Sequence, residues 1–391
     1  MNALFQHRNK ILSAYNGQLP LSVFLKQYFK QYPVLGSRDR RILSSAAFSH
    51  YRASKAIPFL DDEKKQVAAE FILCEQESPD YSRMIEGILP PEQGNSLKER
   101  INFLKLQEID VDLNKIIPEN EGLSDGVSTD EWIERLLGRT AVFIKPEKGF
   151  EKEVIKNLEK NRVLFEQGDN GEIKLRQGVN LANYLKPQSY RIQDWASQEV
   201  VKFLPQKAPS FIWDVCAGAG GKSLILAEAF PNARLLVSDV RPSILINLEE
   251  RFKRLNRKLP RMMEMDLTQL PKQFDPLGGE KADLIVCDLP CTGSGTWGRT
   301  PEQAYFFKSE TLQNFSQKQR EITIKASEYL APEGKLLFIT CSIFREENEN
   351  NVEKICNQTG LKLLRQTTIN GFKNQADCLF IAELSNQLDT Y

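Results

Sequence analysis

The sequence has few of the residues that build metal sites. Its 391 residues include two histidines, His7 and His50, and neither lies near a cluster of cysteines. The seven cysteines contain no C-x-x-C pair, whereas zinc sites are built from closely spaced sets of cysteine and histidine ligands. We therefore expect no metal site. Only Cys287 and Cys291 lie close together, which fits a reducing compartment better than a disulfide framework.

Long apolar segments are also missing. No run of about 18 apolar residues occurs, so the sequence predicts no membrane span. Met1 to Lys10 carries Gln6, His7 and Arg8 where a signal peptide would need an apolar stretch. With 41% hydrophobic and 27% charged residues, the composition is typical of a soluble globular protein. We expect a cytoplasmic protein, with no membrane partner, that is a monomer.

The formal net charge of +0 hides a strong asymmetry along the chain. Residues 1–58 hold nine Lys or Arg against one acid, Asp39, and residues 61–130 hold seventeen acids against seven basic residues. A basic block followed by an acidic block favours a polyanion-facing surface near the N-terminus. The alternative is two solvated helical faces of opposite sign that pack together. Charge alone does not decide between them.

Patterns along the chain predict several domains. Apolar residues recur at helical spacing in Leu21, Phe24, Leu25 and Tyr28, and from Ser210 onward strands alternate with helices. The turn at 168–171 predicts a hairpin in a small α/β module. Alternation of strands and helices predicts a mostly parallel, doubly wound sheet that binds ligands at the carboxyl ends of its strands. The predicted divisions are a helical domain at 1–118, a linker at 119–137, the module at 138–188 and a Rossmann-like α/β domain at 189–391.

Five strands are predicted in the last domain, with one more near the chain end. They are 211–215, 234–238, 261–265, 283–287, 335–340 and 378–383. The first is followed directly by a glycine-rich turn, Asp214-Val-Cys-Ala-Gly-Ala-Gly-Gly-Lys-Ser223. A phosphate-binding P-loop would need glycine where Cys216 stands, and the dinucleotide fingerprint fails at Ser223. The turn is therefore neither of these two common phosphate-binding loops.

Aspartates at three further strand ends strengthen the indication of a nucleoside site. Asp239 ends the second strand, about twenty residues beyond the glycines, where an acid binds ribose hydroxyls. Asp266 and Asp288 end the third and fourth strands. A single aspartate there is usually a turn or cap residue. Three in register disfavour a pyrophosphate and fit S-adenosylmethionine, which is cationic at sulfur. The candidate cofactor residues are Cys216, Ala217, Gly218, Ala219, Gly220, Gly221, Lys222, Asp239, Asp266 and Asp288.

Two cysteines follow the ends of the fourth and fifth strands. In a doubly wound sheet these strands are expected to be neighbours, so Cys291 and Cys341 would flank one pocket. Cysteine is also a common buried small hydrophobe, and we assign that role to Cys74, Cys356 and Cys378 and mostly to Cys216 and Cys287. Methylation of pyrimidine C5 needs a thiolate that adds at C6 and makes C5 nucleophilic. Asp288 would stabilise the adduct by hydrogen bonding to N3 or N4 of the base.

These motifs resemble the RNA 5-methylcytosine methyltransferase family, most closely its bacterial 16S ribosomal-RNA branch. The resemblance covers about Tyr190 to Phe380 in the family's order of motifs. The matching segments are Gln193-Asp194 with Ser197-Gln198, Cys216 to Lys222, Asp239, Asp266, Asp288-Leu-Pro-Cys291, and Thr340-Cys-Ser342 with Glu346-Glu-Asn-Glu349. The resemblance implies that Cys341 is the nucleophile, that Cys291 assists release, and that S-adenosylmethionine is the methyl donor.

Outside these motifs the likeness is weaker. Residues 36–41 and Tyr51-Arg52 look like the helical, antitermination-factor-like RNA-binding domain of the bacterial enzymes. Lys145-Pro146, Ala219 and Asp377-Cys-Leu-Phe380 depart from the family's usual residues. The resemblance implies small-subunit rRNA as substrate, with tRNA as an alternative. A non-catalytic RNA-binding assembly factor is an alternative of another class, against which the intact Cys291 and Cys341 argue. A DNA cytosine methyltransferase would carry its nucleophile in the fourth-strand motif.

Overall fold

The computed structural model describes residues 3–74, 96–118, 121–271 and 274–386. The chain forms two compact units, each built from separate stretches of sequence. One unit contains 1–121, 128–140 and 296–309, and the other contains 122–127, 141–295 and 310–391. Part of the acidic block, 75–95, and the start of the predicted linker, 119–120, lie outside the described residues.

The first unit is helical. Its described helices are α1 (Ala3–Ala14), α2 (Leu21–Gln31), α3 (Ser37–Ala53), α4 (Glu63–Leu73), α5 (Leu97–Leu106), α6 (Thr129–Leu137), α11 (Pro301–Phe306) and the 3-10 helix η2 (Leu113–Ile116). Helix α2 buries Leu21, Leu25 and Tyr28, as the helical spacing predicted. The core of this unit joins these residues to Leu43 and Ala47 of α3. Helix α11 packs on α3, although nearly 250 residues separate the two in the sequence.

The structure divides the chain differently from the predicted boundaries. The predicted linker at 119–137 contains α6, which Ser128 caps through its hydroxyl, and α6 packs with α3 in the helical unit. Residues 122–127 of the same stretch belong to the other unit, where Ser124 N–H donates to the Ile343 carbonyl at 2.8 Å. The glycines and serines of this stretch form a helix cap and turns between ordered segments. Composition alone does not distinguish such turns from a linker between domains.

A small antiparallel sheet begins the second unit. Its strands β1 (Val142–Pro146), β2 (Phe165–Gln167), β3 (Ile173–Leu175) and β4 (Tyr190–Ile192) run in the order β2-β3-β1-β4. Helix α7 (Glu151–Lys160) packs Val154 and Leu158 against them. The predicted hairpin is present, with Gln167 paired to Ile173. Strand β4 lies beyond the predicted end of this module at 188, and it pairs with β1.

The second unit also contains a seven-stranded sheet in the order β10-β11-β9-β8-β5-β6-β7. The strands are β5 (Phe211–Asp214), β6 (Arg234–Asp239), β7 (Arg261–Glu264), β8 (Ala282–Asp288), β9 (Leu330–Thr340), β10 (Lys362–Asn370) and β11 (Cys378–Ser385). Strands β7, β6, β5, β8 and β9 are mutually parallel, and β10 and β11 add an antiparallel edge. The predicted neighbours β8 and β9 are paired directly. The six predicted strands are present, and β10 was not predicted.

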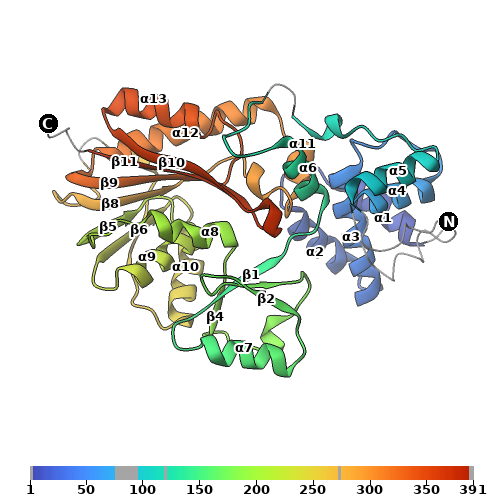
Figure 1. Cartoon of the computed structure of the whole chain (residues 1–391), viewed down its shortest axis with the longest axis horizontal. Coiled ribbons are helices and arrows are strands. Elements are labelled where there is room, and N and C mark those ends of the chain that lie inside the picture. The colour runs from blue at the N-terminus through green and yellow to red at the C-terminus, as the bar shows by residue number, and fades with distance from the viewer. Residues whose placement is uncertain (1–2, 75–95, 119–120, 272–273, 387–391) are drawn as a thin grey trace. The chain divides into compact units, whose positions relative to one another are not determined.

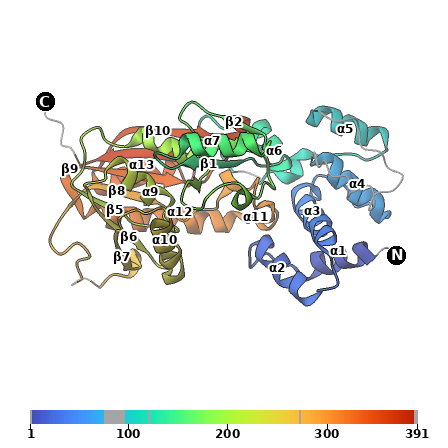
Figure 2. The same cartoon turned by 90° about the horizontal axis from the view of Figure 1, so that it is seen from below.

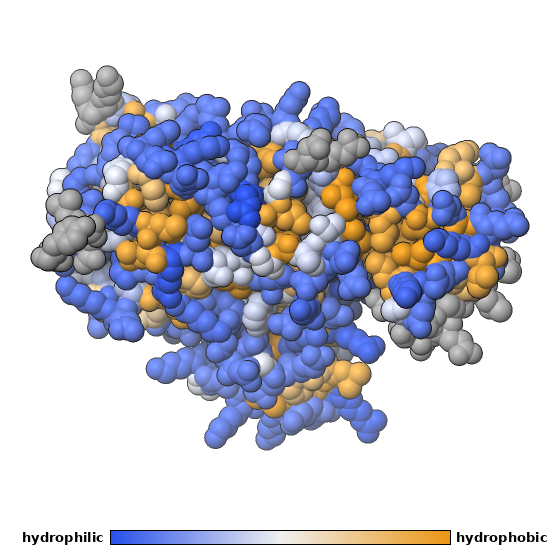
Figure 3. All heavy atoms as spheres, turned by 45° about the horizontal axis from the view of Figure 1, so that its top comes forward, coloured by the Kyte–Doolittle hydropathy of each residue, from blue (hydrophilic) through white to orange (hydrophobic). Residues whose placement is uncertain are grey.

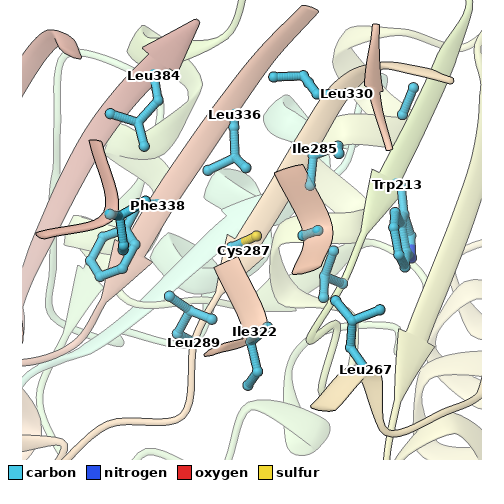
Figure 4. Close-up of a cluster of buried hydrophobic side chains, with 14 of the residues drawn as sticks. Trp213, Leu267, Ile285, Cys287, Leu289, Ile322, Leu330, Leu336, Phe338 and Leu384 are labelled. Carbon is cyan, nitrogen blue, oxygen red and sulfur yellow. The ribbon is translucent and has the colours of Figure 1, made fainter. Parts of the chain in front are cut away.

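Helices cover both faces of this sheet (Figure 1 and Figure 2). One face packs against α12 (Ser309–Ser327) and α13 (Glu349–Thr359), and its core contains Trp213, Cys287 and Phe338 (Figure 4). The other face packs against α8 (Trp195–Glu199), η4 (Val200–Phe203), α9 (Gly221–Ala229) and α10 (Pro242–Arg254). The remaining 3-10 helices are η3 (Leu181–Asn183), η5 (Leu267–Gln269), η6 (Ser294–Thr296) and η7 (Phe372–Asn374). This layering is the doubly wound arrangement that the sequence predicted.

Hydrophilic side chains cover most of the face drawn in Figure 3, and hydrophobic residues gather there in patches. Among the described residues, no helix is both long and apolar enough to cross a membrane. The described part of the chain also contains no group of three or more His, Cys, Asp or Glu side chains that could hold a metal ion.

Candidate active site

The turn after β5 forms an open cradle at the carboxyl edge of the parallel strands. Gly218 and Gly220 have φ values of +53° and +80°, a backbone region that favours glycine. A Cβ on Gly220 would stand 2.7 Å from Cγ of Leu248 in α10, so the turn packs closely against that helix. A Cβ on Gly218 would meet no atom within 4 Å. The space beside Gly218 is therefore open.

Asp214, the last residue of β5, lies fully buried beneath this turn. Its Oδ2 accepts a hydrogen bond from the Ser223 hydroxyl at 2.6 Å. Its Oδ1 is buried and has no hydrogen-bond partner among the described residues. Burial raises the pKa of this carboxyl to about 7, although the bond from Ser223 opposes the rise. A carboxyl of this kind exchanges its proton near neutral pH.

Asp239, at the end of β6, is held in place by an arginine that the sequence analysis did not single out. Its Oδ1 accepts from the backbone N–H and Nε of Arg241, at 3.0 and 2.9 Å. Its Oδ2 accepts from Nη2 of Arg241 and from the Gly218 N–H, at 3.1 and 3.0 Å. Burial favours the neutral acid, but these donors outweigh it and hold the pKa of Asp239 below its usual range. The carboxylate therefore stands ionised beside Gly218.

The other predicted cofactor residues have mixed roles in the structure. Asp266 follows β7 and caps η5, where its Oδ1 accepts from the N–H and hydroxyl of Thr268 at 2.9 and 2.6 Å. Ala217 is buried against α10. The carbonyl of Ala219 accepts from Arg251 at 2.7 Å, and the carbonyl of Gly221 accepts from Gln193 at 2.9 Å. The backbone of the turn is thus held by side chains of Arg251 and Gln193, which lie outside it.

Lys222 joins the turn to the fourth strand end. Its Nζ lies 3.0 Å from Oδ2 of Asp288, the last residue of β8. Burial disfavours the ammonium, but Asp288 outweighs that cost and raises the pKa of Lys222. The lysine therefore stays protonated.

The predicted pair of thiols is brought together. Sγ of Cys291, in the loop after β8, lies 3.1 Å from Sγ of Cys341, directly after β9. The hydrogen bond from Cys291 lowers the pKa of Cys341, and the charge of Lys222 also favours its thiolate. The same hydrogen bond, with burial, raises the pKa of Cys291 well above its usual value. Of the two thiols, Cys341 therefore loses its proton more readily than Cys291.

Close backbone packing holds the two cysteine loops against each other. The N–H of Gly295 donates to the Cys341 carbonyl at 2.9 Å. A Cβ at Gly295 would stand 2.2 Å from the Cys378 carbonyl and 3.0 Å from that of Cys341, so no larger residue fits here without displacing the backbone. The glycine in the loop after Cys291 is therefore a packing requirement of the site.

Two further residues next to the thiols had a specific sequence signal but no predicted role. Glu347 and Asn348, in the Glu346–Glu349 run, are fully buried. Glu347 accepts from the Thr292 hydroxyl at 2.6 Å, and Asn348 donates to the Ser342 carbonyl at 2.9 Å. A buried acid and a buried amide must be paired, and the sequence signal for these two residues was their place in the motif that follows Thr340-Cys-Ser342.

In the helical unit, two arginines of the basic block are not at the surface. Arg8 is 5% exposed and pairs with Glu70 at 2.8 Å. Arg52 is 6% exposed and donates to the carbonyls of Leu136 and Gly138, at 2.7 and 3.0 Å. Arg38 and Arg41 are exposed on α3. The positive charge that the basic block presents at the surface is therefore smaller than the sequence count indicated.

The doubly wound sheet of the second unit has a Rossmann-like fold. Two solved structures share the fold: PH0851, with a TM-score of 0.66 at 20% identity over 98% of this chain and 97% of that chain, and NSun6 from Pyrococcus horikoshii with SFG, with a TM-score of 0.56 at 18% identity over 66% and 94%.

Residues 201–382 match the model of the family described as 16S rRNA methyltransferase RsmB/F. Ribosomal RNA small subunit methyltransferase B of Shewanella oneidensis is 30% identical over 168 residues, 43% of this chain and 38% of that protein. The protein of the same name from Klebsiella pneumoniae is 29% identical over the same shares. The match thus spans less than half the length of these relatives. Residues 201–382 are therefore similar to the RsmB/F family, which confirms the resemblance seen in the motifs of this region.

Proposed function

We propose that the protein transfers a methyl group from S-adenosylmethionine to C5 of a cytosine in RNA. One observation carries the proposal: the thiols of Cys341 and Cys291 lie 3.1 Å apart at adjacent strand ends, near the Lys222–Asp288 pair, with the pKa of Cys341 lowered and that of Cys291 raised. Methylation of an amine or hydroxyl needs no thiol, because such an acceptor already has a lone pair. Methylation at C5 needs one thiol as the nucleophile, and a second thiol beside it can assist release.

The cradle fits the proposed methyl donor. Asp239 would hold the ribose hydroxyls, and the open face of Gly218 gives room for close approach of the ligand to the backbone. The carboxylates of Asp239 and Asp288 suit a cationic sulfonium better than a pyrophosphate. When bound there, S-adenosylmethionine supplies an electrophilic methyl group that an activated C5 accepts.

The chain's own residues would activate and release the base. Cys341 adds to C6, and the electrons of the C5=C6 bond move toward C5 and N3, while Asp288, paired with Lys222, would accept a hydrogen bond from the N4 amine of the base. After methylation a base removes the C5 proton. The C5=C6 bond then reforms and the bond between Cys341 and C6 breaks. Cys291, 3.1 Å away, is placed to return a proton to the departing sulfur.

Small-subunit ribosomal RNA is the proposed substrate, since the matched relatives are small subunit rRNA methyltransferases by name. Transfer RNA is the alternative. Exposed Arg38 and Arg41 on α3 offer positive charge to a phosphate backbone.

A methyl-transfer assay tests the proposal. The purified full chain is incubated with total RNA and S-adenosylmethionine labelled on its methyl group, and the product is digested to nucleosides. We expect 5-methylcytidine in the small-subunit rRNA fraction, and bisulfite sequencing then locates the site. Label on an exocyclic amine or a hydroxyl would contradict the thiol mechanism. RNA binding without transfer would favour a non-catalytic assembly factor.

A further inference from the structure

The backbone on both sides of Cys291 is held by a buried carboxylate, Glu347, and its hydrogen-bond partner, Gln319. Glu347 accepts the Thr292 N–H at 2.9 Å and the Thr292 hydroxyl at 2.6 Å. Glu347 also accepts from Nε2 of Gln319 at 2.9 Å, and the same nitrogen donates to the Pro290 carbonyl at 2.9 Å. Pro290 and Thr292 are the two neighbours of Cys291, so the Glu347–Gln319 pair fixes this thiol from both sides.

Asn348, the residue after Glu347, holds the backbone on both sides of Cys341. Oδ1 of Asn348 accepts from the Thr340 hydroxyl at 2.5 Å, and Nδ2 of Asn348 donates to the Ser342 carbonyl at 2.9 Å. Thr340 and Ser342 are the two neighbours of Cys341. Nδ2 also donates to the Ser124 hydroxyl at 2.7 Å, so all polar atoms of this amide are engaged.

We propose that Glu347 and Asn348 are positioning residues that together act as a brace, setting the separation of the two thiols and keeping their shared proton on Cys291. Because the two residues are adjacent, the loops that carry the thiols are tied to a single turn of the chain. Both side chains are 0% exposed, so a ligand does not compete for their hydrogen bonds.

The negative charge of Glu347 supplies the second part of the brace. Burial raises the pKa of Glu347, and the donors from Thr292, Gln319 and Ser342, which favour the ionised form, offset that rise only in part. Its negative charge raises the pKa of Cys291 and also opposes the thiolate of Cys341, but its bonds to Thr292 place it next to Cys291, where we expect the larger effect. Other groups act on the pair as well: Lys222 favours the Cys341 thiolate, whereas Asp288 opposes it, and the thiol of Cys378 on β11 lies nearby.

Thiol alkylation tests the charge part of the brace without RNA. Full-length protein is treated with iodoacetamide over a range of pH, and the label on each cysteine is read by peptide mass spectrometry. Cys341 should react faster than Cys291 at neutral pH. In Glu347→Gln this preference should fall by about tenfold, which corresponds to one pKa unit. Glu346→Gln is the matched control, since Glu346 pairs instead with Lys354 at 2.6 Å. An unchanged preference in Glu347→Gln overturns the charge role.

Oxidation by diamide tests the spacing part. Diamide takes the hydrogens of the two thiols and becomes a hydrazine while a sulfur–sulfur bond forms, so Cys291 and Cys341 should be linked rapidly with a loss of two hydrogens. Asn348→Ala should slow this step several-fold, whereas Asn350→Ala, which removes a bond to Glu346 at 3.1 Å, should not. Equal rates in the two variants overturn the spacing role.

Thermal melting identifies variants that fail to fold. If Glu347→Gln is among them, Thr292→Val is compared with Thr292→Ser, which keeps the hydroxyl donor. The valine variant should slow the diamide reaction and the serine variant should not, and equal rates again overturn the brace. The inference rests on the proposed function for its catalytic meaning, but its tests do not. Altered thiols together with no methylation by the wild type would leave the brace standing and remove the proposed function.

Discussion

The two sulfurs of the site are close but not equivalent. Cys341 has a lowered pKa because Cys291 donates to it, and Cys291 has a raised pKa for the same reason. An acid and a nucleophile 3.1 Å apart can divide the attack and the release between them. This division is a property of single residues, so single substitutions test it.

Replacing each cysteine should therefore stop the reaction at a different step. Cys341→Ala should form no bond to RNA and should not turn over. Cys291→Ala should attack and transfer methyl, then stall as a protein–RNA species that survives denaturing electrophoresis. The double variant should lose that species, and Cys356→Ala on α13 serves as the control. Adduct in Cys341→Ala but not in Cys291→Ala would reverse the assignment.

Asp239 is the residue expected to contribute most directly to cofactor affinity. Asp239→Ala removes a charged acceptor, and also frees Arg241 from its two side-chain bonds to it. We expect S-adenosylmethionine binding to weaken by roughly 1.5–3 kcal/mol, the usual range for hydrogen bonds to a charged group. Calorimetry with Glu280→Ala as a control measures this, because Glu280 pairs with Arg234 at the start of β6. Equal affinity in wild type and Asp239→Ala would remove this residue from the site.

Asp214 should make the stability of the fold depend on pH. Its folded pKa is about 7 against an ordinary 3.8, so between these values the native state keeps a proton that the unfolded chain has lost. Stability from this group is therefore greatest in acid and is lost as pH rises toward 7. In Asp214→Asn this loss is absent, so the free energy of unfolding of the variant relative to wild type should rise by up to about 4 kcal/mol over that window. Urea titrations at several pH values that give a constant difference would contradict the raised pKa.

At the scale of elements, residues at strand ends were the part of the site that sequence could predict. Asp239, Asp288, Cys291 and Cys341 each follow a strongly apolar strand, and parallel strands carry such residues to one edge. Strand β10 was not predicted because its first six residues are exposed and show no alternation. The partners of Cys291 and Cys341 were not predicted either, since Gln319 and Glu347 meet only after α12 and β9 have packed.

The partners of the charged residues in the basic block could not be predicted from the sequence either. Arg8 is neutralised by Glu70, 62 residues away, and Arg52 binds carbonyls at the end of α6, 84 and 86 residues away. Counting charges along the sequence cannot find such partners, because they are defined by helix packing. Arg40 is also partly structural, since its Nε donates to the Leu35 carbonyl at 2.8 Å.

The exposed arginines of α3 are thus the sharper test of RNA binding. Reversing Arg38 and Arg41 to Glu should weaken binding to RNA and lower the slope of log affinity against log salt by about one to two, because fewer counterions are released. Lys64→Glu with Lys65→Glu makes the same change of charge at exposed positions of α4 and should have a smaller effect. Cofactor affinity should stay the same in both. Equal effects of the two pairs would mean that only net charge matters.

At the scale of the whole molecule, the chain passes repeatedly between its two units. Residues 128–140 and 296–309 leave the sheet-containing unit and complete the helical one. In the helical unit, Trp132 of α6 and Trp297 are each 1% exposed, and their rings lie 5.8 Å apart. Helices α6 and α11 both pack on α3. Neither excursion could be predicted from composition, because each is a short segment of mixed polarity whose packing partner, α3, is distant in the sequence.

Removing residues 1–121 should therefore expose apolar surface without destroying the sheet. A fragment of residues 122–391 keeps all seven strands of the large sheet but leaves α6 and α11 without α3. We expect it to bind an apolar fluorescent dye, to aggregate and to unfold at lower temperature than the full chain, because buried side chains such as Trp132 contribute a few kcal/mol each. Residues 1–121 supplied as a separate chain should reverse these effects. A fragment that is monomeric, binds no dye and melts with the full chain would show that the helical unit does not need these two segments as its packing partners.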